Sequence, residues 1–131
     1  MMEAAVVVAA DGSVLHWHQP AGRSAMSLPD SRDLWEVIWA HRGLIAGIAH
    51  THPGSGWPRP SWEDVTTFAA CEDGLGRRLS WWIATSDRVR RYHWSGPRKH
   101  DYAGGFPVGP TPWLGHLRVI SGFTEPIWSA P

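Results

Sequence analysis

Two histidines and an aspartate lie close together in the stretch HTHPGSGWPRPSWED, which runs from residue 50 to residue 64. Residues i and i+2 of an extended chain project to the same side, so His50 and His52 can direct their imidazole nitrogens to one point. Zinc binds such nitrogens at about 2.0–2.1 Å and also accepts a carboxylate oxygen, which Asp64 could supply. Three protein ligands leave a fourth position for water, as in catalytic zinc sites.

The same stretch has a plainer interpretation, in which a histidine-containing turn precedes a helix. Ser61 and Asp64 have the spacing of a capping box, where the serine hydroxyl caps the helix and the acid three residues on reaches back. Each feature alone is weak. The combination of His-x-His-Pro with Ser-x-x-Asp favours one zinc ion per chain, held by His50, His52 and Asp64.

The elements before the motif follow from turn signals and periodicity. The segment 4–20 predicts a hairpin that turns at Asp11-Gly12. The segment 27–43 carries helix signals, with Pro29 and Asp30 or Ser31 at its start and Gly43 as a stop. The apolar run 44–50, LIAGIAH, predicts a central strand covered on both faces. This strand would lead directly into the histidine motif.

The elements after the motif are a helix and a second hairpin. The helix is predicted from about Trp62 to Glu72, with Val65, Phe68 and Ala69 on its buried side. LSWWIAT and RVRRYHW, separated by Ser86-Asp87, predict the hairpin. From residue 96 onward the chain is rich in Gly and Pro, with one possible short strand, HLRVISGF, so we expect a loop-rich wrap or a partly mobile segment there.

Composition limits the classes of protein to consider. The chain has 131 residues, 43% of them hydrophobic and 18% charged, which is typical of one folded domain. Twelve basic and twelve acidic side chains cancel, so charge gives no reason to expect nucleic acid or an anionic membrane as partner.

With Cys71 as the single cysteine, any metal must rely on His, Asp and Glu. No apolar run approaches the roughly 20 residues that span a bilayer. Cytoplasmic residence is the expectation.

At this point the sequence resembles a known family. His50-Thr51-His52-Pro53 followed by Ser61-Trp62-Glu63-Asp64 is similar to the zinc-peptidase signature of the JAB1/MPN/Mov34 (JAMM) domain, prokaryotic type. The resemblance covers about residues 3–95 of one domain spanning 1–131. It implies an α/β fold, a mixed β-sheet flanked by helices with the layering of cytidine deaminases. It also implies that His50, His52 and Asp64 ligate zinc and that Ser61 donates a hydrogen bond to the developing oxyanion.

The family also uses an upstream glutamate as general base, and Glu3 occupies that position at the head of the first predicted strand. The alternative for Glu3 is an exposed acid at a frayed chain end. Glu36 is the rival upstream acid, although it lies within a predicted helix. Glu63 is expected to face solvent on the first helical turn. His16 and His18 share a strand face but lack a third ligand, so we expect ordinary strand residues.

The resemblance implies a deubiquitinase-like isopeptidase. Its substrate would be a ubiquitin-like or sulfur-carrier protein, cleaved at the peptide or isopeptide bond after its C-terminal tail. Trp57, on the loop beside the metal, could contact that tail or pack over the helix start.

An alternative is a non-catalytic interaction module whose tryptophans form a partner surface. A DNA-associated role, like that suggested for RadC-type proteins, fits the neutral charge poorly. The oligomeric state is not indicated.

Overall fold

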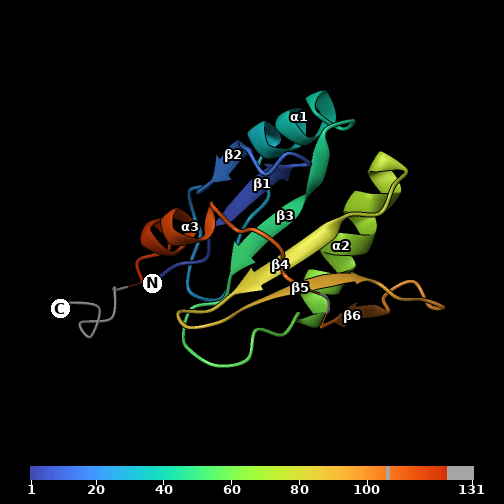
Figure 1. Cartoon of the computed structure of the whole chain (residues 1–131). Helices are drawn as coiled ribbons and strands as arrows, with labels where there is room; N and C mark the ends of the chain where they lie inside the picture. Colours follow the sequence, from blue (N-terminus) through green and yellow to red (C-terminus); the bar gives the residue numbers. More distant parts are fainter. Residues whose placement is uncertain (106, 124–131) are drawn as a thin grey trace.

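A six-stranded mixed sheet with three helices accounts for the regular structure of the computed structural model, which describes residues 1–105 and 107–123 (Figure 1). The strand order is β2-β1-β3-β4-β5-β6, and of the neighbouring pairs only β3 and β4 run parallel. The predicted α/β class is therefore confirmed. In chain order the elements are β1 (Ala5–Ala9), β2 (Val14–His18), α1 (Arg32–Ala40), β3 (Ile45–Thr51), α2 (Trp62–Leu75), β4 (Ser80–Ala84), β5 (Val89–Trp94), β6 (Tyr102–Gly104) and α3 (Leu114–Ile120).

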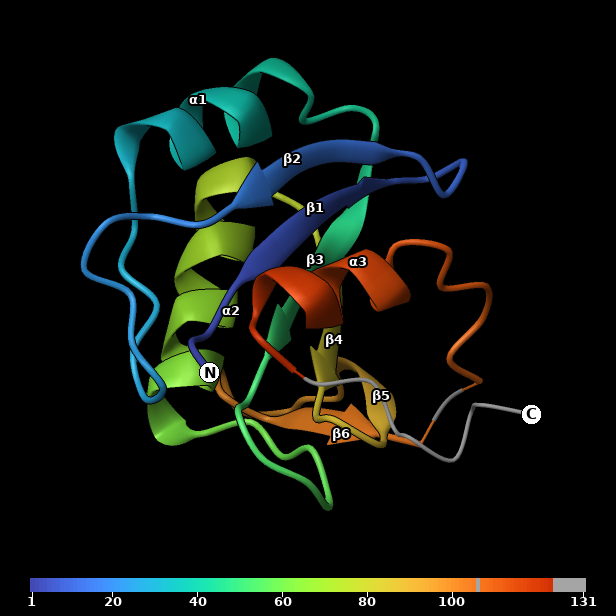
Figure 2. The ribbon, with the colours of Figure 1, turned by 90° about the vertical axis from the view of Figure 1, so that its left-hand side faces the viewer.

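Helices cover both faces of the sheet, as Figure 2 shows for α2 and α3. On one face, Ile38 of α1 and Phe68 of α2 belong to the same buried cluster as Trp81 of β4. On the other face, Trp113 and Leu117 pack with apolar residues of β1, β3 and β4. The apolar residues on both sides of the central strands thus find partners, which explains why these strands read as nearly continuous hydrophobic runs.

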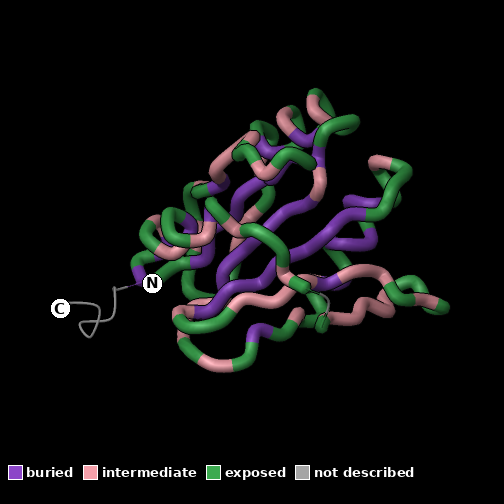
Figure 3. Tube along the Cα trace, viewed as in Figure 1, coloured by how far each residue is buried: buried purple, intermediate pink, exposed green. Residues whose placement is uncertain are grey.

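The central strands β1, β3 and β4 form the most deeply buried part of the chain (Figure 3). β3 lies one residue later than the predicted 44–50. Gly47 lets β3 approach β4 closely, because a Cβ at this position would lie 1.9 Å from the Ser80 carbonyl oxygen. The two predicted hairpins are both present, as β1–β2 and β4–β5.

Both helices beside the motif begin where the caps predict, but their ends differ from the prediction. α1 starts after the N-cap Ser31 and stops at Ala40, before the predicted Gly43. α2 continues to Leu75, past the predicted Glu72, and ends at Gly76, whose φ of 69° is left-handed. Within the described residues, no helix has the length and apolar character needed to cross a bilayer.

Most described residues of the C-terminal segment lie outside helices and strands, as predicted, but the strand predicted at HLRVISGF is wrong. β6 extends the sheet beside β5, and residues 116–120 belong to α3. The β-branched Val119 and Ile120 favoured a strand, whereas Trp113 and Leu117, spaced i and i+4, pack together on the sheet. Residue 106 and residues 124–131 of this segment lie outside the described part.

Candidate metal centre

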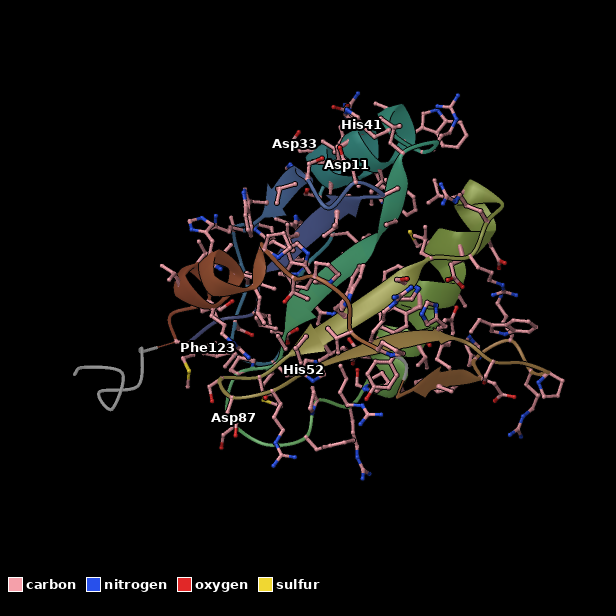
Figure 4. All side chains as sticks on the ribbon, viewed as in Figure 1. Asp11, Asp33, His41, His52, Asp87 and Phe123 are labelled. Atoms are coloured by element: carbon pink, nitrogen blue, oxygen red, sulfur yellow. The ribbon has the colours of Figure 1, made fainter. Side chains whose placement is uncertain are left out.

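The C-terminal end of β3 positions the two histidines of the motif. His50 and Thr51 are the last residues of the strand, and His52 follows at the start of the loop (Figure 4). Thr51 is fully buried and bonds to the opposite side, with its Oγ1 accepting a hydrogen bond of 3.0 Å from the Ala4 amide. The alternation of an extended chain therefore turns His50 and His52 to one side.

Asp64, on the first turn of α2, meets both imidazoles. Its Oδ1 lies 3.2 Å from His50 Nε2 and its Oδ2 lies 2.9 Å from His52 Nε2. The two Nε2 atoms are themselves 3.1 Å apart. Ligands of a tetrahedral zinc ion with bonds of about 2.0–2.1 Å are separated by about 3.3 Å. The three side chains predicted as ligands are thus brought together, with each histidine facing a different oxygen of Asp64.

Hydrogen bonds and a bound cation would use this arrangement differently. With a hydrogen on each Nε2, His50 and His52 donate to separate oxygens of Asp64, and the two nitrogens lie 3.1 Å apart. Burial raises the pKa of Asp64, but the hydrogen bonds from His50 and His52 outweigh this effect and leave its pKa well below its usual range. Asp64 is therefore a carboxylate, and a cation between the three groups would use its lone pair and those of both imidazoles.

The electrostatics of His52 agree with an anionic site. Burial lowers the pKa of His52, but the hydrogen bond and charge of Asp64, together with the charge of Glu3, raise it above its ordinary value. The protein environment of this imidazole thus stabilises positive charge. A divalent cation would benefit from the same field.

The predicted capping box fixes the orientation of Asp64. The Ser61 amide donates to Asp64 Oδ2 over 2.8 Å, and the Asp64 amide donates to Ser61 Oγ over 3.0 Å. One carboxylate thus caps the helix and faces both histidines. Since Ser61 Oγ acts as an acceptor in the cap, its own hydrogen can be donated elsewhere.

Glu3 lies beside the histidines and is 9% exposed, so the alternative of an exposed terminal acid is wrong. One ligand atom from each of Glu3, His50 and His52 lies within 4.8 Å of the other two, a group that could hold a metal ion. Burial raises the pKa of Glu3, while the charges of His50 and His52 lower it in part, leaving it above its usual value. No described group donates a hydrogen bond to its carboxylate.

Backbone contacts hold Glu3 in place despite its position near the chain start. Its amide donates to the Ser24 carbonyl over 2.8 Å, and Arg23 Nη1 donates to its carbonyl over 3.3 Å. The Met2 amide donates to the Ser121 carbonyl, just after α3. No sequence pattern predicts these contacts, because Arg23 and Ser121 lie in stretches without periodicity. They replace the fraying expected of a terminus.

The other candidate residues lie outside the cluster. Glu36 is exposed and pairs with Arg32 at 2.9 Å, and Glu63 is exposed as predicted. His18 Nε2 donates to the Pro29 carbonyl over 2.7 Å. Trp57 is half exposed, and the Arg90 guanidinium lies 4.0 Å from its ring centroid.

The loop between the histidines and α2 is fastened to the turn that joins β4 and β5. The Ser86 amide donates to the Gly54 carbonyl, and the Gly56 amide donates to Asp87 Oδ1, each over 2.9 Å. Tyr92 of β5 donates its hydroxyl hydrogen to the Pro58 carbonyl. His52 and Asp87 accordingly lie at the same end of the sheet in Figure 4, opposite Asp11 and His41. The β4–β5 turn and β5 thus hold this loop in place.

Comparison with known proteins adds no assignment to this geometry. No model of a protein family matches the chain, and no curated protein matches it.

Proposed function

We propose that this chain is a zinc-dependent metallopeptidase that hydrolyses a peptide or isopeptide bond. His50, His52 and Asp64 would hold one zinc ion, because their facing atoms are 2.9–3.2 Å apart. The observation that carries the proposal is Glu3 beside these ligands: the residue is 9% exposed and lines a cavity, and its carboxylate receives no hydrogen bond from any described group. An acid in a cleft with a raised pKa and no structural partner is a candidate for catalysis.

The chain's own residues have distinct roles in this proposal. When bound, zinc would act as a Lewis acid on the scissile carbonyl and on water. Glu3 accepts a proton from the attacking water and returns it to the leaving amine, so the amide bond breaks and a carboxylate and an amine form. Ser61 donates its hydroxyl hydrogen to the carbonyl oxygen as negative charge develops there.

The substrate we propose is the one implied by the JAMM resemblance, a ubiquitin-like or sulfur-carrier protein joined through its C-terminal tail to an amine. An extended tail could pair with main-chain groups near the motif. The absence of nucleic-acid and membrane partners, and cytoplasmic residence, stay predictions.

A hydrolysis assay tests the proposal. The zinc-loaded chain is incubated with a ubiquitin-like protein fused through its C-terminal glycine to a reporter, and separately with the same protein linked to a lysine side chain. Intact mass spectrometry should detect a new carboxylate at the tail in at least one reaction. His52→Ala should produce none. Equal cleavage by the wild type and His52→Ala would contradict the proposal.

Exposed tryptophans favour a second candidate, a non-catalytic interaction module. Trp62 is 69% exposed, and Trp39 and Trp57 are also exposed. Exposed large aromatics are enriched in protein interfaces. This candidate predicts intact folding after removal of metal by a chelator and no hydrolysis by the zinc-loaded chain. Circular dichroism and the hydrolysis assay separate the two functions.

A further inference from the structure

A cavity of about 500 Å³ leads away from the metal centre between α1 and α2. At one end its lining includes Glu3, His50, His52 and Asp64. The remainder is largely apolar, with side chains from the segment before α1, both helices and the sheet: Leu28, Leu34, Ile38, Ile48, Phe68 and Trp81. The space opens to solvent and is continuous with the candidate catalytic residues. Concave sites of this kind suit a ligand.

Size and lining define the chemistry of the ligand. The volume lies within the roughly 300–1,000 Å³ of small-molecule sites, which combine apolar walls with a few convergent polar groups. The described lining contains no lysine or arginine, whereas Asp30 and Glu63 contribute further acids. Away from the metal centre, an anionic group would thus be repelled by these acids and would find no lysine or arginine to pair with.

We propose that the cavity binds a large uncharged apolar group, a side chain or an acyl chain, attached directly beside the amide bond that is hydrolysed. The inference rests on the proposed function, because it places the amide at the metal centre and the apolar group against Phe68 and Trp81. It also restricts the substrate class. A tail that ends in glycine offers no such group on its acyl side, so with that substrate the group would belong to the amine side.

Peptide hydrolysis tests this preference. The zinc-loaded chain is given blocked, neutral peptides in which Ala, Leu or Phe stands on either side of one amide bond. We expect kcat/KM to be about tenfold to a hundredfold higher for Phe than for Ala on one side. A free carboxylate on the same residue should abolish the advantage. Equal rates for Ala and Phe on both sides would overturn the inference while leaving the proposed hydrolysis intact.

A matched pair of variants tests the location. Ala70 of α2 and Ala40 of α1 are both exposed helical alanines, but only Ala70 lines this cavity. Ala70→Trp should fill the cavity and remove the preference for Phe, whereas Ala40→Trp should retain it. Circular dichroism and zinc content establish that both variants fold. Loss of the preference in both variants, or in neither, would contradict the assigned site.

A binding measurement separates this inference from the proposed function. The ¹⁹F NMR line of N-acetyl-4-fluorophenylalanine amide should broaden with the metal-free wild type and Ala40→Trp, but not with Ala70→Trp. The corresponding free acid should broaden less. Broadening without hydrolysis of any peptide would support the apolar cavity and contradict the peptidase. Hydrolysis of Ala peptides without broadening would support the peptidase and contradict the cavity ligand.

Discussion

Two buried glutamates of this domain, Glu3 and Glu72, have opposite surroundings. Glu72 is 3% exposed, and its carboxylate accepts hydrogen bonds of 2.8 Å from the Leu79 amide and 3.0 Å from Trp81 Nε1. Arg78 and the Tyr102 hydroxyl also donate to it. Glu3 is 9% exposed, yet no described group donates to its carboxylate. Both residues are largely buried, but Glu72 receives hydrogen bonds from the protein, whereas Glu3 lines the open cavity.

The difference teaches how to separate a structural acid from a functional one. Glu72 lies on α2, and its donors come from the loop before β4, from β4 and from β6, so its charge joins four parts of the fold. A buried charge with this many partners is satisfied and has no capacity left for chemistry. The groups facing Glu3 are His50 and His52 of the candidate metal centre. Its carboxylate therefore remains available to a water or a substrate.

Exchanging each acid for its amide gives the largest expected effects. Glu3→Gln should retain zinc and folding but lower kcat by about 10²–10⁴-fold, because the amide cannot accept the proton. Glu72→Gln should lower the free energy of unfolding by about 1.5–3 kcal/mol, because charged hydrogen bonds are lost, and should retain kcat. Steady-state kinetics and urea unfolding measure the two quantities. A comparable loss of kcat in both variants would contradict the distinction.

The two helix caps permit the same comparison for serine. Ser31 Oγ accepts a hydrogen bond from the Leu34 amide over 3.1 Å, and Ser61 Oγ accepts one from the Asp64 amide over 3.0 Å. Ser31→Ala and Ser61→Ala should each lower the free energy of unfolding by about 0.5–2 kcal/mol. Only Ser61→Ala should also lower kcat, by about 10²–10³-fold, through loss of an oxyanion donor. Equal kcat values in the two variants would remove Ser61 from the mechanism.

Two tyrosines give effects on stability alone, without an expected change in kcat. Tyr102 donates to the charged Glu72, whereas Tyr92 donates to the neutral carbonyl of Pro58. Tyr102→Phe should lower the free energy of unfolding by about 1.5–3 kcal/mol and Tyr92→Phe by about 0.5–1.5 kcal/mol. Thermal melting of both variants checks the order. A larger loss for Tyr92→Phe would show that Glu72 is less dependent on its donors than its contacts indicate.

The elements that carry local signals could be predicted from the sequence. The spacing of His50 and His52, and the capping box from Ser61 to Asp64, are local, and the structure reproduces both. The hairpin at Asp11-Gly12 and the apolar strand before His50 follow from alternation and turn residues. For such features the chain near each residue decides its conformation.

The features that depend on distant residues could not be predicted in this way. The placement of Glu3 requires Thr51 and a backbone contact after α3, and the sequence does not reveal that α3 returns to this part of the sheet. The donors of Glu72 lie up to 30 residues away along the chain. The helix α3 is set by packing of Trp113 and Leu117 on the sheet, against the strand preference of Val119 and Ile120.

Zinc content per chain tests the central claim most directly. The wild type and His52→Ala are purified without a chelator or a histidine tag, and bound metals are measured by elemental mass spectrometry on protein whose folding is established by circular dichroism. We predict about one zinc ion per wild-type chain and almost none in His52→Ala, because three ligands are needed for a site of this kind. Folded wild-type protein that neither contains zinc nor takes it up would contradict the metal centre.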